Sequence, residues 1–391
     1  MKINRPKNDI LLIAAVTILL TIGLIMVFSA SAVVAHEKHG SLLYFSRKQI
    51  FWGFLCIMGI FVFSRLKLNL TFNKGVPLIL VATSIVLLIG LFLWGDLVNG
   101  ARRWYNLGIA SFQPSEFAKF ALIIYFADIL SRKGKTLDDW KKGLLPHLIL
   151  FMLVLIPIYF QPDLGTVIMI SLVISVMIFL SNVRFKHILA GVVFLIPAVI
   201  IKLQGSSYQL KRITDWIQNL DNPLGSGYQI KQSLIGLGNG GILGTGIGTS
   251  KQKFYFLPDS HTDFVFAILG EEIGFIGTSV VLILFLIILW RGVSIAKRAN
   301  NTFAQYLAIG FTFNLVLYAY MNAAVATMLM PTTGLPMPFL SYGGSSLLFA
   351  GVSVGILMNI ARNTNNSVLN RRYASNHTSG REIHNTLVMS R

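Results

Sequence analysis

The chain has 391 residues, of which 54% are hydrophobic and 12% are charged, and its formal net charge is +18. Soluble globular domains carry about 25% charged residues, so this composition excludes an ordinary soluble protein and predicts a membrane protein. A basic excess is also typical of nucleic-acid-binding proteins. Here, however, most lysines and arginines fall between the apolar runs on one side, as the positive-inside rule predicts for cytoplasmic loops. We therefore expect no nucleic-acid partner.

Apolar runs long enough to cross about 30 Å of hydrocarbon recur along most of the chain. They predict an all-α polytopic membrane protein with about ten transmembrane helices and both termini in the cytoplasm. Several runs are short, so about eight or nine helices remain alternatives. The expected spans are Ile10–Phe28, Ile50–Ser64, Val76–Trp94, Pro114–Leu130, Leu144–Phe160, Leu164–Ser181, His187–Ile201, Phe264–Trp290, Phe303–Met330 and Ser345–Ile360.

The spans belong to one predicted membrane domain, residues 1–362, in which residues 204–260 form the one large extracytoplasmic loop. This loop contains the amphipathic run YQLKRITDWIQNL, which is suited to lie along the outer interface. The glycine-rich stretch after it lacks the GK[ST] ending of a phosphate-binding loop, so we interpret its glycines as points of close packing. Residues 363–391 are polar without apolar periodicity and predict a disordered cytoplasmic tail. A single cysteine, Cys56, excludes an intrachain disulfide.

The stretch VNGARRWYNLGIASFQPSEFAKFA, residues 98–121, carries charges into an otherwise apolar region. Arg102, Arg103 and Trp104 lie on the predicted outer side, where arginines beside an interfacial tryptophan bind either lipid headgroups or the phosphates of a substrate. Glu116 and Lys119 lie three residues apart on one face of a predicted helix. They are expected to form an ion pair, either purely structural or part of a site.

The stretch HTDFVFAILGEE, residues 261–272, opens the eighth predicted span. Asp263 has two compatible interpretations. It completes a capping box in which Ser260 is the N-cap, or it accepts a proton from a hydroxyl bound at the external mouth of the helix bundle.

Glu271 and Glu272 lie about 12 Å further along the same predicted helix, too deep to share a surface site with Asp263. Carboxylates at such a depth require interior partners or a water-filled cavity. The nearest expected partners are Lys119, Asn314, Tyr318, Tyr320 and Asn322.

Two external turns complete the pattern, QPDLGT at 161–166 and TGLPMPFLSYGGSS at 333–346. The prolines and the Gly-Gly pair of the second turn predict a rigid re-entry rather than a plain loop. The unusual polar groups thus converge on the predicted external face.

These motifs resemble the SEDS family (shape, elongation, division and sporulation), which includes FtsW, RodA and SpoVE. The resemblance runs from MVFSAS at 26–31 to the last span and includes NGARRW, QPSEFAK, QPDLGT, DNPLGSGYQIKQS, the HTDF stretch and TGLPMPFLSYGGSS in that order. The beginning and the end of the chain resemble FtsW more than RodA. Met328 departs from the family pattern, which has glycine or another small residue there.

The resemblance implies a peptidoglycan glycosyltransferase that polymerises lipid II into glycan strands at the outer face of the bacterial cytoplasmic (inner) membrane, during cell division or growth. It also implies a class B penicillin-binding protein transpeptidase as a partner, together with other division or elongation proteins. Asp263 falls on the catalytic aspartate of the family, and Arg102, Arg103 and Trp104 fall on the NGARRW motif.

The chemistry of this reaction suggests the remaining roles. Positive charge favours departure of the pyrophosphate leaving group, and the candidates for supplying it are Arg102, Arg103, Lys119 and Lys251. A divalent cation, Mg²⁺ or Mn²⁺, is an optional aid, and the sequence identifies no ligands for it. One inversion converts the α-linked donor into a β-1,4 bond, so Asp263 suffices as the single general base. Glu116, Glu271 and Glu272 are then expected to support the cavity.

Two other functions fit the same motifs. A lipid II flippase would use buried charges along a translocation path, and it requires polar groups at graded depths that face both leaflets. A non-catalytic scaffold for a class B penicillin-binding protein would use Asp263 only as a helix cap. A polymerase instead concentrates its indispensable groups on the external face, as Asp263 and Arg102 are expected to do.

Overall fold

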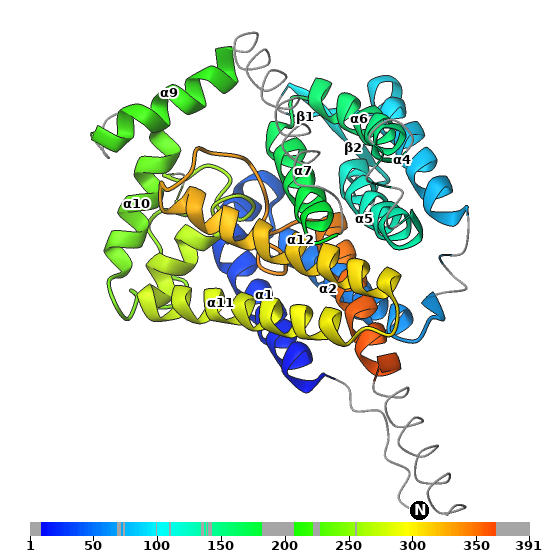
Figure 1. Ribbon diagram of the computed structural model, residues 1–391. Coiled ribbons are helices and arrows are strands. Elements are labelled where there is room, and N and C mark those ends of the chain that lie inside the picture. Colours follow the sequence, from blue (N-terminus) through cyan, green and yellow to red (C-terminus); the bar gives the residue numbers. More distant parts are fainter. Residues whose placement is uncertain are drawn as a thin grey trace, which may run out of the picture.

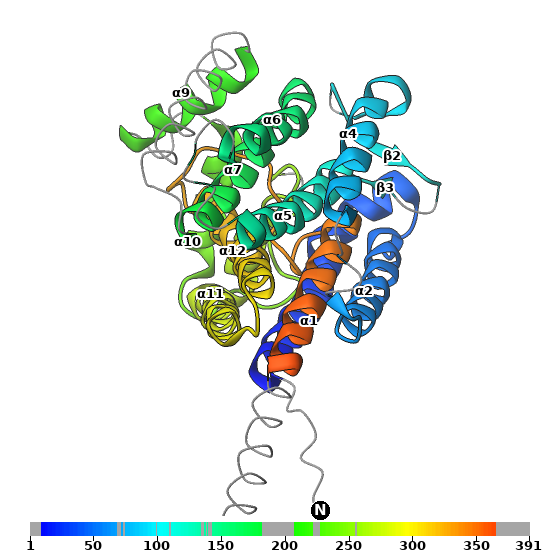
Figure 2. The same ribbon diagram turned by 45° about the vertical axis from the view of Figure 1, so that its right-hand side comes forward.

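The computed structural model describes residues 9–68, 72, 75–98, 100–108, 111–133, 137, 139, 143–181, 207–221, 227–254 and 256–364. Within these residues the fold is a bundle of long helices with a small β-sheet at one end (Figures 1 and 2). The helices are α1 (Ile10–His39), α2 (Tyr44–Phe63), α4 (Val76–Trp94), α5 (Pro114–Lys133), α6 (Leu145–Phe160), α7 (Leu164–Phe179), α9 (Ser207–Asp221), α10 (Tyr228–Gly240), α11 (Val265–Arg298) and α12 (Thr302–Ala326). A last helix covers Gly344–Thr364.

Among the described residues, six helices are long and apolar enough to cross a membrane: α1, α2, α4, α11, α12 and the last helix. The apolar helices α6 and α7 are shorter, with 16 residues each. Each predicted span overlaps a described helix except 187–201, which lies outside the described residues. Most of the predicted tail and most of residues 134–142 also lie outside them. The chain is therefore a mostly helical, multi-pass membrane protein.

The all-α prediction was wrong between α4 and α5. There the chain forms a three-stranded antiparallel sheet in the order β1 (Asp96–Val98), β2 (Ala101–Asn106) and β3 (Ser111–Phe112). The sequence carried a signal for it, because Asn-Gly separates the paired residues Val98 and Ala101 and Gly100 adopts φ +78°. Asn-Gly is the preferred dipeptide of two-residue hairpin turns. The sheet matters because β2 carries the predicted arginine pair.

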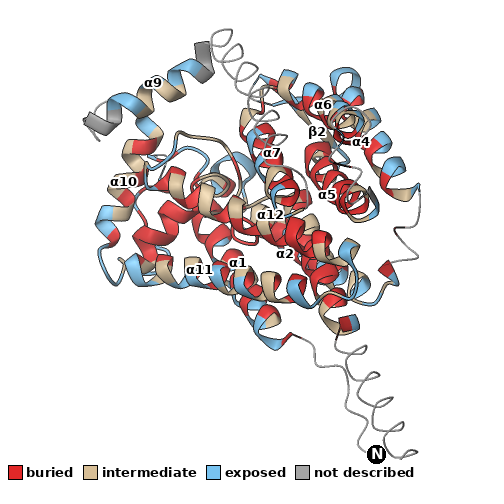
Figure 3. Cartoon of the chain, viewed as in Figure 1, coloured by how far each residue is buried: buried red, intermediate tan, exposed pale blue. Residues whose placement is uncertain are grey.

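Burial follows the position of each helix in the bundle (Figure 3). Nearly every described residue of α5 is buried, and α11 and α12 bury the faces that they turn toward the bundle. Large apolar side chains such as Phe54 (64% exposed) and Val86 (69% exposed) point outward from α2 and α4. An outer surface of this composition matches hydrocarbon rather than water.

Helix α11 is broken at Gly274, whose φ of +73° is not helical. Around the break the helix lacks its own hydrogen-bond partners, and the chain after α10 replaces them. The amides of Thr245 and Gly246 donate to the carbonyls of residues 271 and 272, at 2.9 and 3.0 Å. The amides of residues 275 and 276 donate to the carbonyls of residues 241 and 242, at 2.9 and 3.2 Å. A broken helix is tolerated at membrane depth only when its freed backbone groups are satisfied in this way.

Glycines permit this close approach. A Cβ atom on Gly274 would lie 2.4 Å from the backbone nitrogen of Gly244, and one on Gly240 would lie 1.9 Å from the carbonyl oxygen of Gly270. The glycines of the loop therefore serve packing, as the sequence suggested. They also bring residues 240–246 of the predicted external loop alongside α11 as far as its break.

The proline-rich segment between α12 and the last helix is non-helical, and its part from Leu335 to Ser341 is largely buried. Leu335, Met337 and Phe339 are each at most 3% exposed. The side-chain amide of Asn322, on α12, donates to the carbonyl of Leu335 at 2.8 Å. Irregular backbone enclosed by helices in this manner forms a rigid wall, and part of that wall faces the site described next.

Candidate active site at the start of helix α11

Asp263 lies in the turn that directly precedes α11. The capping box predicted for it was wrong, because α11 begins at Val265 and its N-cap residue, Phe264, makes no side-chain cap. The hydroxyl of Ser260 instead donates to the carbonyl of Ala30 in α1, at 3.3 Å. The backbone holds Asp263 in place. Its amide donates to the carbonyl of residue 259 at 3.1 Å, and its carbonyl accepts from Asn322 at 2.7 Å.

A cavity of about 250 Å³ lies beside Asp263. It is bounded by β2, the start of α7, α9, the turn before α11 and the segment after α12. Its polar and aromatic lining residues are Arg103, Trp104, Arg212, Asp259, Asp263, Thr332 and Thr333. Five segments that are far apart in the sequence therefore meet at one carboxylate.

The electrostatics of the cavity suit proton transfer. The pKa of Asp263 is raised from 3.8 to about 7, first by burial and then by the charge of Asp259, against the lowering effect of Arg212 and Arg103. A group with a pKa near the operating pH makes an effective general base. The arginines also leave positive charge available for an anionic group bound in the same cavity.

His261, two residues earlier, is the neighbouring alternative base. Its ring packs against Phe45 and Tyr342, with centroid distances of 4.8 and 5.8 Å. Burial lowers the pKa of His261 to about 4, so its neutral ring is a weak base at pH 7. Asp263 is therefore the stronger candidate.

The structure separates the two predicted phosphate-binding arginines. Side chains alternate between the two faces of a strand, so adjacent residues of β2 diverge. Arg103 lines the cavity, and its guanidinium donates to the carbonyls of Gln161, at 2.9 Å, and Pro162. Arg102 is exposed and donates to the carbonyl of Phe92 at 3.0 Å. Only Arg103, with Trp104 beside it, faces Asp263.

Arg212 is a cavity residue that sequence reasoning missed. It lies on α9, the amphipathic helix, and donates to the carbonyl of Thr332 at 3.1 Å. Trp216, one turn further along α9, donates to the carbonyl of Met328 at 2.8 Å. The signal was present in the run YQLKRITDWIQNL, which was interpreted only as an interfacial helix. Together these two bonds dock α9 against the segment after α12.

The two lysines predicted to supply positive charge, Lys119 and Lys251, do not line the cavity. Lys119 forms the predicted ion pair with Glu116, at 2.8 Å, and its ammonium lies 3.7 Å from the centre of the Tyr318 ring. These three residues line a separate, very small cavity of about 20 Å³. The side chain of Lys251 is exposed. Its backbone amide donates to Glu271 at 3.2 Å, and its carbonyl accepts from the amide of residue 254 at 3.1 Å.

Glu271 and Glu272 have partners other than those expected from α5 and α12. Glu271 accepts from the hydroxyl of Ser250 and from the amides of residues 251 and 252, both at 3.2 Å. Glu272 accepts from the hydroxyl of Ser29, at 2.6 Å, and pairs with the ammonium of Lys253, at 3.2 Å. Because these partners come from α1 and the loop before α11, the expectation of Lys119, Asn314, Tyr318, Tyr320 or Asn322 was wrong.

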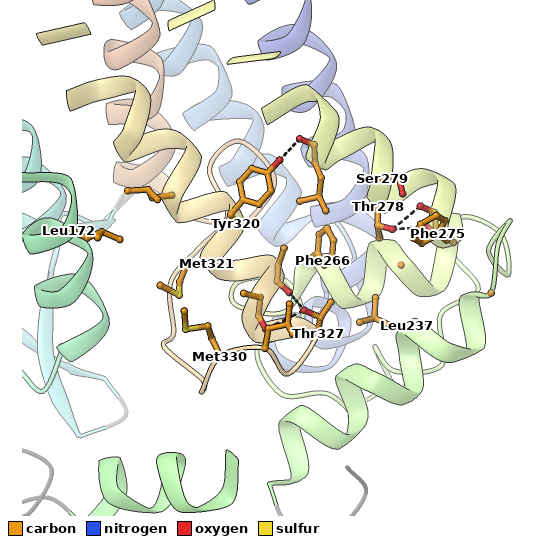
Figure 4. A pocket seen from close by; sticks show the side chains of 18 residues that line it. Leu172, Leu237, Phe266, Phe275, Thr278, Ser279, Tyr320, Met321, Thr327 and Met330 are labelled. Carbon is orange, nitrogen blue, oxygen red and sulfur yellow. Dashed lines mark hydrogen bonds between the residues drawn. The ribbon is translucent and has the colours of Figure 1, made fainter. Parts of the chain in front are cut away.

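A second, apolar cavity of about 700 Å³ lies between α11 and α12 (Figure 4). Three of the hydroxyl groups in its lining are bonded within the protein: Tyr320 donates to the carbonyl of Leu282 at 3.0 Å, and Thr278 and Thr327 donate to carbonyls of their own helices. The lining therefore offers no free donor to a ligand from these groups. Consecutive residues of the segment after α12 line the two cavities, Met330 this one and Pro331 the cavity of Asp263.

Within the described residues, no group of three or more histidine, cysteine, aspartate or glutamate side chains is placed to hold a metal ion. Asp259 and Asp263 are the two carboxylates that line the cavity. Mg²⁺ is commonly bound by one or two carboxylates together with substrate phosphates, so this pair fits a cation that arrives with a phosphorylated substrate.

Comparison with known proteins identifies the family. The family model described as "Cell cycle protein", FtsW/RodA/SpoVE, matches residues 9–366. Stage V sporulation protein E of Bacillus subtilis (strain 168) is 40% identical over 93% of this chain and 99% of its own length. The probable peptidoglycan glycosyltransferase FtsW of Trichlorobacter lovleyi is 38% identical over 91% of this chain and 93% of its own.

Solved structures support the same family assignment. A chain from a study of how a peptidoglycan synthase complex coordinates polymerization and crosslinking superposes with a TM-score of 0.73 at 26% identity, covering 91% of this chain and 98% of that one. The rod shape determining protein RodA of Thermus thermophilus gives 0.67 at 25% identity, covering 91% and 97%. The resemblance derived from the motifs is therefore confirmed, and the chain belongs to the FtsW/RodA/SpoVE family, with FtsW-like relatives among its matches.

Proposed function

We propose that this protein is a peptidoglycan glycosyltransferase that polymerises lipid II at the outer face of the cytoplasmic membrane. The observation that carries the proposal is the placement of Asp263, with a pKa of about 7, in one cavity with Arg103 and Arg212. Family membership and the names of the relatives support the same activity.

In the proposed reaction, the carboxylate of Asp263 accepts the proton of an acceptor sugar hydroxyl. The hydroxyl oxygen then bonds to the anomeric carbon of the donor, and the bond from that carbon to the pyrophosphate oxygen breaks with inversion. Arg103 and Arg212 stabilise the negative charge that develops on the departing pyrophosphate. Held by Asp259 and the phosphates, Mg²⁺ or Mn²⁺ would add further positive charge.

The polyprenyl chain of the substrate has no hydrogen-bonding groups and requires an apolar site. The cavity between α11 and α12 (Figure 4) meets this requirement, because apolar side chains form most of its lining and three of its hydroxyls are bonded within the protein. Its lining adjoins that of the Asp263 cavity along the chain, at Met330 and Pro331. We place the chain there, with the pyrophosphate toward Arg103 and Arg212.

The proposed partner is a class B penicillin-binding protein, whose transpeptidase crosslinks the glycan that this protein makes, together with other division or elongation proteins. The structural relative from a complex that coordinates polymerization and crosslinking supports this assignment.

The proposal is tested with purified protein and lipid II, with and without a cognate transpeptidase. The wild type should form glycan polymer, and Asp263→Asn should lower the rate by about 10²–10⁴-fold, the usual contribution of a general base. Asp96→Asn is the matched control, because Asp96 is an exposed carboxylate on β1 that does not line the cavity. A wild type that makes no polymer under either condition would refute the proposal, and polymer from the Asn variant would assign the base elsewhere.

A flippase is the second candidate, and the buried charges are the features that favour it. Glu116 and Lys119, however, pair with each other, and Glu271 and Glu272 bind protein groups, whereas a translocation path needs groups that exchange with a moving substrate. Transfer of a fluorescent lipid II analogue across vesicles by Asp263→Asn, with no polymer from the wild type, would favour the flippase.

The proposal also requires the Asp263 side of the bundle to face outside. In a Cys56→Ser background, a cysteine at position 221 should react with an impermeant thiol reagent in intact cells, and a cysteine at position 138 should not. The reverse labelling pattern would place the cavity in the cytoplasm, where lipid II polymerisation is excluded.

A further inference from the structure

Glu271 and Glu272 fasten one short segment, residues 250–253, to helix α11. Glu271 binds the hydroxyl of Ser250 and the amides of residues 251 and 252. Glu272 accepts from the amide of residue 250, at 3.4 Å, and from the ammonium of Lys253, at 3.2 Å. Every residue of the segment therefore contacts one of the two adjacent carboxylates.

The Lys253–Glu272 ion pair is enclosed by protein. The side chain of Lys253 is 6% exposed and that of Glu272 is 0% exposed. The ammonium also donates to the hydroxyl of Ser29, at 3.2 Å, and to the carbonyl of Gly248, at 2.5 Å. Buried ion pairs contribute little net stability over an apolar pair of the same volume, so this one calls for an explanation other than stability.

The pair lies at one end of the segment that carries Asp263, and both ends of that segment are attached to the same place on α1. Lys253 and Glu272 bind Ser29, whereas Ser260 donates to the carbonyl of Ala30, the next residue. Between these attachments, the amide of residue 257 donates to the carbonyl of residue 252 at 2.9 Å. The described residues between the ion pair and Asp263 thus form a short segment that is attached to α1 near both of its ends.

Beyond Ser260, the carbonyl of Asp259 accepts from the amides of residues 262, 263 and 264, at 3.1, 3.1 and 3.3 Å. A shift of the 250–260 path would therefore move Asp259 and Asp263 together. Both carboxylates line the cavity opposite Arg103 and Arg212, so such a shift changes the distances on which the reaction depends.

We propose that Lys253 and Glu272 are positioning residues for the glycosyl transfer: their ion pair, completed by Ser29, fixes the path from residue 250 to residue 263 and holds the Asp263 carboxylate in the cavity. The proposal rests on the function proposed above.

The test compares three full-length variants with the wild type in the lipid II assay. Lys253→Met leaves Glu272 unpaired, and Lys253→Met/Glu272→Gln removes both charges, which relieves the unpaired buried charge. Arg132→Met is the control, because it removes the ion pair that Arg132 forms with Asp128 on α5, at 2.6 Å, away from the cavity. The measurements are kcat, KM, the melting temperature and amide hydrogen exchange in peptides covering residues 256–264.

A displacement of about 1 Å in a catalytic group costs up to about 10²-fold in rate. Lys253→Met should therefore lower kcat by about 10- to 100-fold per folded molecule, with KM within about twofold of the wild type. In the double variant the melting temperature should recover while kcat stays at least about tenfold low. Exchange in residues 256–264 should be faster in both variants, and Arg132→Met should match the wild type in kcat and exchange.

A purely structural role predicts a different outcome. The double variant would then recover kcat together with its melting temperature, and exchange at 256–264 would match the wild type, which would overturn the proposal. Hydrogen exchange does not depend on activity. If the wild type itself makes no polymer, the proposed function fails, but the exchange data still decide whether the ion pair orders the Asp263 segment.

Discussion

Replacing Asp263 with asparagine should make the folded protein more stable at neutral and alkaline pH while it lowers the polymerisation rate by about 10²–10⁴-fold. Burial and Asp259 raise the pKa of Asp263 from 3.8 to about 7 in the folded protein. The folded state thus holds this proton more tightly than the unfolded state, and ionisation of the carboxylate destabilises the fold. No described residue donates a hydrogen bond to the carboxylate that asparagine would forfeit.

The sign and the size follow from linkage. A carboxyl group with a raised pKa contributes its full stability below the unfolded value, and that contribution is lost as the pH rises through the folded value. One pKa unit corresponds to about 1.4 kcal/mol, so the full loss is about 4 kcal/mol well above pH 7. Between pH 5 and pH 8.5, the advantage of the asparagine variant should grow by about 3 kcal/mol, less where water reaches the side chain.

The assay is thermal unfolding of both proteins in the same detergent or nanodisc across that pH range. The variant should melt slightly higher at pH 5, where about 1–2 kcal/mol of the loss is already present, and several degrees higher at pH 8.5. Asp96→Asn, which changes an exposed carboxylate on β1, should show no such divergence. A difference in melting temperature that does not change with pH, or a variant that is less stable at pH 8.5, would show that ionisation of the Asp263 carboxylate does not destabilise the fold.

Three further predictions follow from the same geometry. The polymerisation rate should rise with pH and reach half its maximum near pH 7, because the catalytic aspartate must be ionised. In a pH–rate profile, Asp259→Asn should move this midpoint to lower pH and Arg212→Gln should move it to higher pH. Arg103→Gln should lower kcat/KM by about 10- to 100-fold, whereas Arg102→Gln should change it by less than about twofold, because only Arg103 lines the cavity. Equal effects of the two variants in the lipid II assay would contradict the different roles of these arginines. Met328→Gly should raise the free energy of unfolding by about 1 kcal/mol, since a φ of +65° strains a residue with a Cβ atom, and denaturant titration measures it.

The sequence predicted well whatever depends on local spacing. Apolar runs located the helices, and the three-residue spacing of Glu116 and Lys119 predicted an ion pair that the structure confirms. Asp263 was recognised from its motif, and the structure places it beside a polar cavity.

The failures have a common physical cause, which is competition from distant partners. Ser260 does not cap α11 because Ala30, 230 positions away, takes its hydroxyl. Glu272 pairs with Lys253 and Ser29 rather than with the expected groups of α5 and α12. Such contacts join α1 to the loop before α11, and no periodicity in either segment signals them.

The separation of Arg102 from Arg103 is a failure of a different kind, because its signal was local. The Asn-Gly dipeptide before Ala101 is typical of a hairpin, and a strand after it sends adjacent side chains to opposite faces. An interpretation of the stretch as a plain loop treated the two arginines as equivalent. Recognising the hairpin would have predicted that only one of the two arginines faces the site.

The break in α11 also bears on how the protein is made. Two glutamates within a lone inserting helix would each cost up to about 2.5–3.5 kcal/mol, the value for the helix centre, and the backbone around Gly274 would add unpaired amides and carbonyls. Residues 241–253, which supply all the replacement bonds along with Ser29, leave the ribosome before α11 does. Helix α11 can therefore insert into the membrane only together with α10 and the chain that joins them, so the unit of insertion is residues 228–298 rather than a single helix.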